Sequence, residues 1–330
     1  MWTPETIQRM VRQGVEIPSY RRAVENFEEL TKLPLSKSSL ARLVDEYGGQ
    51  VVETQAREAE ATVRAPERDE EVITRRQIPE PDSEVMAVSF DGAMINIRGE
   101  GWKEVKIATI SAVENEVLLE RDEEKEIKQT HHSYRAGLWD AKEFGKQQWA
   151  EGCRRGLERA RQVVAVADGA HWIWLIIAMC YAPCIEIIDW WHTVEKLWGA
   201  ANEALGQGES QTAAWVEVQK QQLWSGNLRA ILAAIRQIWP RERPLSEAIW
   251  PTISYLYHNR RRMAYQDYHQ AGYPIGSGSV ESACKVVVQE RMKQAGMRWS
   301  RDGAQAMLAL RSVLLSGRWN DTWPLTRSTA

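Results

Sequence analysis

The chain has 330 residues, enough to bury one large core or two smaller ones, and its 44% hydrophobic and 26% charged content is that of an ordinary globular protein. With 42 Lys and Arg against 45 Asp and Glu, the net charge of −3 excludes binding of polyanions through overall basicity, so any nucleic-acid contact needs a local patch. The longest apolar run, Trp172 to Ala182, is too short to cross a bilayer and the four cysteines are scattered, which favours a cytoplasmic protein with free thiols and no membrane partner.

Residues 1–57 are predicted to form a helical N-terminal segment. Tyr20 to Leu33 carries apolar residues at helical spacing, and Pro34 stops this helix. Ser36 or Ser38 is placed to cap a second helix. Two helices joined by a short turn fit either the remnant of a helix-turn-helix or a plain helical hairpin, and the sequence leaves both open.

The second helix is expected to end near Gly48 and Gly49, because glycine is common just past a helix end. The chain then becomes polar and charged and closes on Ile78-Pro79-Glu80-Pro81. We therefore interpret residues 58–83 as a linker.

A change of pattern predicts the first part of an α/β core over residues 84–189. Three strand-like runs come first, and the acidic stretch Glu120–Glu126 is expected to form a solvated loop or edge. A long helix is predicted over Trp139–Arg161. Two apolar strands follow, VVAVAD and CIEIID, with a short Trp-rich segment between them. This order predicts a mixed α/β sheet covered by helices.

Residues 190–273 show no strand pattern and are predicted to form four helices, an all-α insertion into the core. The last part of the core is expected over residues 274–330. It opens on the stretch PIGSGSVESACKVVVQERMKQAGMRW, in which a glycine-serine turn starts a helix with Glu281 in its first turn. A final helix is predicted over Ala304–Leu315.

Three acids, Asp91, Asp168 and Glu281, are candidate metal ligands. Asp91 ends the run VMAVSF and Asp168 ends VVAVA, and each is followed by a glycine that leaves room for a ligand above the sheet. Mg²⁺ prefers oxygen ligands, and two such ions about 3.5–4 Å apart can activate an attacking hydroxyl and stabilise the leaving oxygen in phosphoryl transfer. Attack by water nicks a DNA strand, whereas attack by a DNA 3′-hydroxyl joins strands.

Each acid also has a plain structural interpretation. An Asp-Gly pair after a strand is most often a turn. Glu281 fits equally well as a partner of the helix dipole or of Lys285 one turn later. The occurrence of all three acids on an appropriate order of strands and helices favours metal binding over these structural roles.

Four motifs together resemble those of bacterial insertion-sequence transposases of the ISKra type: SFDGAMI, VADGAHWIW, IIDWWHTVEKLW and the stretch from PIGSGS to GMRW. The likeness covers about residues 84–320, and the last motif is the most specific. These enzymes belong to the acid-triad (DDE) transposases with an RNase H-like core. Carried over motif by motif, their triad falls on Asp91, Asp168 and Glu281, and an insertion between the second and third acids is also what this branch looks like.

The resemblance implies cleavage at the ends of an insertion element and strand transfer into target DNA, with two Mg²⁺ or Mn²⁺ ions. It also implies a bacterial, nucleoid-associated protein that acts as a homo-oligomer on DNA. Family members carry a longer N-terminal region that binds the element's ends. Residues 1–57 match only a possible second half of that region, which indicates a truncated copy or a start that lies upstream.

A local basic patch is concealed by the nearly neutral total charge. Residues 257–301 hold eight basic and three acidic residues. The candidate DNA-binding residues are Arg260, Arg261, Lys285, Arg291, Lys293, Arg298, Trp299 and Arg301. Basic contacts of this kind position the phosphate backbone without reading its sequence, although any one of these charges also fits a solvated surface.

Asp189 and His192 stand at the start of the insertion. An Asp-x-x-His pair can bind metal, but we expect it to lock the first helix of the insertion against the core. The turn Gly276–Ser279 lacks the lysine and spacing of a P-loop, so no nucleotide cofactor is expected. Candidates for stacking on a flipped base, with core packing as the other interpretation, are Trp224, Trp239, Trp250 and Trp299.

The leading hypothesis is therefore a metal-dependent DNA transposase. Two alternatives stay open. One is a non-catalytic DNA-binding protein derived from such an enzyme, and the other is an RNase H-like nuclease that chooses its cuts by DNA shape.

Overall fold

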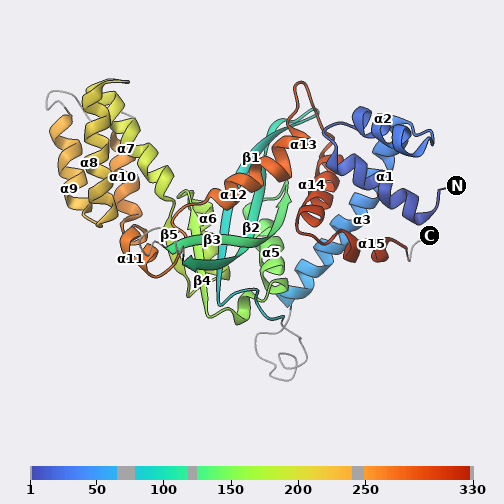
Figure 1. The fold of residues 1–330 in the computed structure, drawn as a ribbon, viewed down its shortest axis with the longest axis horizontal. Helices are drawn as coiled ribbons and strands as arrows, with labels where there is room; N and C mark the ends of the chain where they lie inside the picture. Colours follow the sequence, from blue (N-terminus) through green and yellow to red (C-terminus); the bar gives the residue numbers. More distant parts are fainter. Residues whose placement is uncertain (1, 65–78, 118–124, 240–248, 328–330) are drawn as a thin grey trace. The chain divides into compact units, whose positions relative to one another are not determined.

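The computed structural model describes residues 2–64, 79–117, 125–239 and 249–327 (Figure 1). The chain forms two compact units. The first consists of Met1–Ala112, His131–Arg161 and Gly278–Ala330, and the second of Val113–Thr130 and Gln162–Ser277. Most of the predicted linker and of the predicted acidic loop lies outside the described residues.

The N-terminal segment consists of α1 (Pro4–Glu16), α2 (Tyr20–Thr31) and the first half of α3 (Lys37–Arg64). The chain leaves α2 before Pro34, as predicted. The hydroxyl of Ser36 accepts the N–H of Ser39 at 3.0 Å, which confirms the predicted cap of the second helix.

Helix α3 continues through Gly48 and Gly49, so the predicted helix end there is wrong, and the start of the predicted linker, residues 58–64, is helical. Gly48 faces α14 (Arg301–Leu315), and a Cβ built on Gly48 would lie 2.6 Å from the Cβ of Ala306. The glycine therefore lets the two helices approach closely instead of ending one of them. Figure 1 shows α14 beside α3.

The fold is α/β, with an open, mixed sheet of five strands. In chain order the strands are β1 (Val85–Ile97), β2 (Gly101–Val117), β3 (Lys125–Gly137), β4 (Gln162–Ala167) and β5 (Ile185–Ile188). Their order in the sheet is β3-β2-β1-β4-β5. β1 and β2 are antiparallel, and β4 and β5 are parallel. The predicted mixed sheet with helices is thus confirmed at this level.

Strand β1 runs on past Asp91, which pairs with Ile107 of β2, so the predicted strand end at Asp91 is wrong. The reason is that the apolar alternation resumes after Gly92. Ala93 and Ile95 are buried on the same side as Asp91, and the hairpin with β2 continues through them.

Helices cover both faces of the β1–β2 hairpin within the first unit. On one face, Phe90 meets Phe144 of α5 (Ala141–Arg154) edge to face, with 5.5 Å between ring centroids. On the other face, Ile95 and Ile107 belong to one hydrophobic cluster with residues of α1, α2, α3 and α14. The N-terminal helices therefore share the core of the sheet and do not form a separate body.

The second unit carries the helices that follow the short strands. They are α6 (His171–Cys180), α7 (Trp190–Leu205), α8 (Ser210–Trp224), α9 (Leu228–Ile238), α10 (Ile249–His258), η2 (Arg260–Arg262) and α11 (Tyr265–Gln270). The described part of residues 190–273 is thus helical, as predicted, and Figure 1 shows α7 to α10 packed along one another. Throughout the described ranges, each helix is too short or too polar to cross a bilayer.

The last segment begins with one continuous helical stretch made of α12 (Gly278–Ala283), the π-helical turn η3 (Cys284–Gln289) and α13 (Glu290–Met292). It continues with α14, which starts after the cap Ser300 and so three residues earlier than predicted, and with α15 (Trp319–Arg327).

A buried arginine of α14 holds the π-helical turn. The guanidinium of Arg311 donates to the carbonyl oxygens of Val286 and Val287, the latter at 2.7 Å. It also donates to the carbonyl of Val15 at 2.7 Å. Burial lowers the pKa of Arg311 to about 10, so the group stays charged at neutral pH. Arg311 thereby supplies partners to carbonyls in a stretch where the regular helical bonding is interrupted.

Candidate functional site

Asp91 lies on the face of β1 that is in contact with α12 and η3. Its Oδ1 accepts the N–H of Gly92 at 2.6 Å. Its Oδ2 accepts the S–H of Cys284, with 3.1 Å between oxygen and sulfur. The carboxylate is therefore anchored on one side by backbone and faces the C-terminal helical stretch on the other.

Glu281 joins Asp91 at this thiol. It is exposed in the first turn of α12 and lies three residues before Cys284, which places both on one side of the helix. Burial raises the pKa of the Cys284 thiol above its ordinary range, and the charges of Asp91 and Glu281 raise it further because they oppose a thiolate. Asp91 contacts this sulfur, and Glu281 lies one helical turn before it, within the first unit.

Asp168 belongs to the second unit and follows β4 directly, at the strand end where the sequence predicted it. Its Oδ1 accepts the N–H of Ala170 at 3.0 Å. Gly169 has a φ of +102°, and a Cβ there would lie 2.8 Å from the ring of Tyr255. The Tyr255 hydroxyl donates to the backbone oxygen of Asp168 at 3.0 Å, so a helix of the insertion fixes this loop.

Asp189 is buried and caps α7. One carboxylate oxygen accepts the N–H of His192 and the other accepts the N–H of Ser277, both at 2.5 Å. The N–H of Trp190 donates to the carbonyl of Ile275 at 2.9 Å. These bonds tie the start of the insertion to the loop that ends it, which is a structural role of the kind expected for Asp189.

His192 lies beside this cap. Its Nδ1 is 3.5 Å from a carboxylate oxygen of Glu195, and its ring meets that of Tyr255 edge to face at 5.9 Å between centroids. The imidazole is therefore packed within the insertion, next to the tyrosine that holds the Asp168 loop.

The predicted ligands do not form a complete triad in one unit, because Asp91 and Glu281 belong to the first and Asp168 to the second. Within the ranges that the structure describes, no three His, Cys, Asp or Glu side chains form a group that could hold a metal ion. The carboxylates have the oxygen chemistry that Mg²⁺ prefers. Their joint coordination of an ion stays a prediction.

Arg291 is 1% exposed, so it is not part of the exposed basic surface that the sequence predicted. Its Nε donates to the carbonyl of Gly14 at 3.0 Å, and its guanidinium lies 4.6 Å from the ring centre of Tyr20. Trp299 is also buried, and its indole N–H donates to the carbonyl of Met292 at 3.1 Å. Both side chains lie inside the first unit, where Tyr20 of α2 packs against each of them. Local sequence patterns do not indicate this burial.

The remaining candidate DNA-binding residues are exposed, but they are divided between the units. Lys285, Lys293, Arg298 and Arg301 belong to the first unit, and Arg260 and Arg261 to the second. Arg301 pairs with Glu100, with 3.0 Å between Nε and Oε1. The guanidinium of Arg260 lies 4.5 Å from the ring centre of Tyr257. The structure therefore shows two groups of exposed cations, each in its own unit.

The tryptophans considered for base stacking differ in exposure. Trp239 is buried, and the partly buried Trp224 meets Trp190 edge to face at 5.8 Å between centroids. Trp250, at the start of α10, is 56% exposed and has the accessibility that stacking on a base requires.

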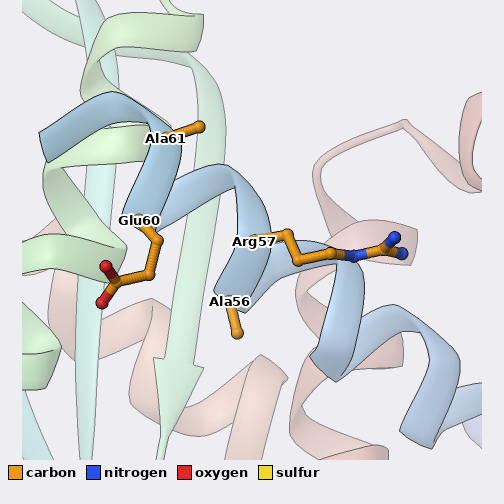
Figure 2. Close-up of a pocket in the computed structure, with 4 residues that line it drawn as sticks. All are labelled: Ala56, Arg57, Glu60 and Ala61. Atoms are coloured by element: carbon orange, nitrogen blue, oxygen red, sulfur yellow. The ribbon is translucent and has the colours of Figure 1, made fainter. Parts of the chain in front are cut away.

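A hollow of about 570 Å³ lies on α3, away from the predicted site residues. Its described lining consists of Ala56, Arg57, Glu60 and Ala61, all from one stretch of the helix. Figure 2 shows Arg57 and Glu60 extending in opposite directions, and Glu60 pairs with Lys146 of α5 at 2.7 Å. The two charged groups do not converge on a ligand, so we assign no function to this hollow.

Comparisons with known proteins add no family to this description. No family model matches the chain, and no curated protein matches it significantly. The resemblance to ISKra-type transposases therefore rests on the four sequence motifs.

Proposed function

We propose that this protein is a metal-dependent DNA transposase of the ISKra type with an RNase H-like core, acting as a homo-oligomer on DNA in the bacterial nucleoid. Asp91, Asp168 and Glu281 are its proposed ligands for Mg²⁺ or Mn²⁺. The observation that carries the proposal is that Asp91 lies on a strand in contact with α12, the helix that carries Glu281, and accepts a hydrogen bond from Cys284 one turn beyond Glu281. Carboxylates from a strand and a helix that converge in this way are suited to hold a divalent ion.

The chain's own residues would act by position and charge. The Gly92 N–H and the Cys284 thiol orient the Asp91 carboxylate, and Arg311 holds the π-helical turn next to Glu281. The bound metal would activate the attacking hydroxyl and stabilise the leaving oxygen. The exposed cations that follow Glu281 would bind phosphates of the DNA backbone and so position the strand.

Cleavage of DNA with the purified full chain tests this proposal. The substrate is a duplex copied from the genomic DNA that flanks the gene, where the proposal expects an inverted repeat, with Mg²⁺ or Mn²⁺. We expect Asp91→Asn, Asp168→Asn and Glu281→Gln each to lower cleavage by about 10³-fold, while DNA affinity changes by less than about 3-fold because the metal step is lost and the phosphate contacts remain.

Two exposed acids provide matched controls, Glu290→Gln in the first unit and Asp267→Asn in the second. Both should cleave as the unaltered chain does. Full cleavage by Asp168→Asn would overturn the triad assignment.

A second candidate is a transposase-derived protein that binds DNA without cutting it. The observation that favours it is that both carboxylate oxygens of Asp91 already accept hydrogen bonds, from the Gly92 N–H and from the Cys284 thiol. This candidate predicts binding of the same duplex, no metal-dependent cleavage, and triad variants that behave like the controls. Cleavage of branched DNA irrespective of the repeat would instead indicate a nuclease that selects DNA by shape.

A further inference from the structure

A pocket of about 430 Å³ opens in the first unit at the place where three helices begin. Ser19 and Arg21 come from the start of α2, Lys37 from the start of α3, and Ser300 and Gly303 from the start of α14. The N-terminal end of a helix carries a partial positive charge from its N–H groups, which favours a nearby anion. The described lining includes neither of the unit's proposed metal ligands.

The charged side chains of the pocket are mainly cationic. Five of them are basic and one is acidic, namely Arg21, Lys37, Arg98, Arg291 and Arg298 against Asp45. Arginine presents a planar fork of donors that fits the oxygen atoms of a phosphate. The pocket therefore combines helix ends, guanidinium groups and a net positive charge.

Two buried donors in this pocket lack a hydrogen-bond partner among the described residues. They are Nη2 of Arg291 and the hydroxyl of Tyr20. The other guanidinium nitrogens of Arg291 are used, since Nε donates to Gly14 and Nη1 to Pro18 at 3.3 Å. Buried polar groups are normally paired, so these two unpaired donors beside a cavity are candidate donors to a bound ligand.

We propose that this pocket binds a phosphate ester the size of one nucleotide. The phosphate accepts hydrogen bonds from Arg291 and Tyr20 at the base of the pocket and pairs with the exposed guanidinium groups of Arg98 and Arg298. A volume of about 430 Å³ is larger than a phosphate ion needs and falls in the range of small-molecule sites. Asp45 adds a negative charge that disfavours further phosphates, so the site selects a monophosphate over a triphosphate.

The phosphate ester has two possible sources, a free nucleoside monophosphate or the phosphorylated 5′ end of a DNA strand. The binding chemistry is the same for both and does not depend on the acids Asp91, Asp168 and Glu281. Only the DNA source rests on the proposed function. Because the binding experiment is carried out in EDTA, without divalent ions, its result is separate from that of the cleavage assay.

Isothermal titration of the full chain with deoxyadenosine 5′-monophosphate tests the pocket. We expect saturable binding, at least about 10-fold weaker binding of deoxyadenosine, and weaker binding of the triphosphate. Arg98→Gln combined with Arg298→Gln should lower the affinity for the monophosphate by about 100-fold, because two charged contacts are lost. Arg42→Gln, an exposed change on α3 outside the described lining, should leave affinity within about 2-fold.

Tyr20→Phe provides a second variant that removes only the unpaired hydroxyl. It should lower the affinity for the monophosphate by about 5-fold. The thermal unfolding temperature of the free protein should not fall, since no described bond is lost. A purely structural hydroxyl would lower that temperature and leave binding unchanged, which would contradict the proposal.

A pair of otherwise identical duplexes, with 5′-phosphate or 5′-hydroxyl ends, separates the two sources. A preference of about 10-fold for the phosphorylated end, lost in the Arg98 and Arg298 double variant, identifies DNA ends as the ligand. Binding of the free monophosphate without that preference identifies a free nucleotide. The proposal is overturned if neither probe binds saturably, or if the double variant binds them as the unaltered chain does.

Discussion

Two strands of the second unit, β4 and β5, run parallel and are each followed directly by an aspartate, yet the two acids are held very differently. Asp189 is 1% exposed, and backbone N–H groups occupy both of its carboxylate oxygens. Asp168 is partly exposed, and its Oδ1 accepts one N–H within its own loop. One acid is built into the fold, and the other is positioned at its surface.

The residue after each acid accounts for the difference. Trp190 starts α7 at once, so Asp189 becomes the cap of that helix. Gly169 adopts a positive φ and separates Asp168 from α6, so the carboxylate stays in a short loop at the strand end. An acid after a strand thus acts as a cap when a helix starts next to it, and is a stronger ligand candidate when a glycine intervenes.

The largest expected effect is on stability. Asp189→Ala should lower the free energy of unfolding by about 3 kcal/mol, because a helix cap is lost and buried N–H groups lose their acceptors. Asp168→Ala should cost less than about 1 kcal/mol, since a partly exposed loop bond is lost. Urea denaturation followed by circular dichroism compares the two. Equal losses would show that the two acids are not held differently.

A smaller loss is expected for Gly169→Ala, about 2 kcal/mol, because alanine is strained at a φ of +102° and its Cβ would crowd Tyr255. Gly208→Ala separates these two causes. Gly208 has a φ of +81°, but a Cβ there would meet no described atom within 4 Å. It should cost about 1 kcal/mol in the same denaturation experiment. If Gly169→Ala costs no more than this control, the contact with Tyr255 does not constrain the loop.

Tyr255→Phe should cost about 1 kcal/mol, since it removes only the hydroxyl that donates to the backbone of Asp168. Tyr257→Phe, on the same helix and 54% exposed, is the matched control and should leave stability unchanged within about 0.5 kcal/mol. The difference between the variants measures how firmly the insertion holds the Asp168 loop. No difference would mean that the hydrogen bond from Tyr255 to the backbone of Asp168 does not stabilise the fold.

Local features of the chain were predictable from sequence because neighbouring residues decide them. The cap at Ser36, the strand end before Asp168 and the helical character of the insertion all follow from short patterns. The continuation of α3 through Gly48 was not predictable, because the same glycine signal ends a helix or admits a second helix, and only the partner Ala306 decides. The predicted helix end was wrong because tertiary contacts, not local propensity, decide where α3 ends.

The candidate site also combines features that the sequence could have indicated with features that it could not. The spacing of Glu281 and Cys284 places both on one side of a helix and could have indicated that they act together. Nothing in the sequence indicated that Arg291 would be buried, since its place depends on the distant α1 and α2 segments. The bond from Tyr255 to Asp168 likewise joins residues that no spacing relates.

The smallest predicted effect concerns Asp91. Like Asp168, Asp91 accepts a local backbone N–H with one carboxylate oxygen. Its other oxygen accepts the thiol of Cys284. Asp91→Asn removes a charge that raises the pKa of Cys284, so the pKa should fall and the thiolate fraction at pH 9 should rise. Alkylation of Cys284 by iodoacetamide, followed by mass spectrometry, should become about 3-fold faster, because the thiolate is the reactive form.

Glu281→Gln should change the alkylation rate in the same direction but less, since Asp91 has the larger influence on the pKa of Cys284. Cys184, whose pKa burial and then Glu186 raise to about 11, is the internal control and should alkylate at an unchanged rate in both variants. An unchanged rate for Cys284 in both variants would show that the charges of these two acids do not control the ionisation of the thiol.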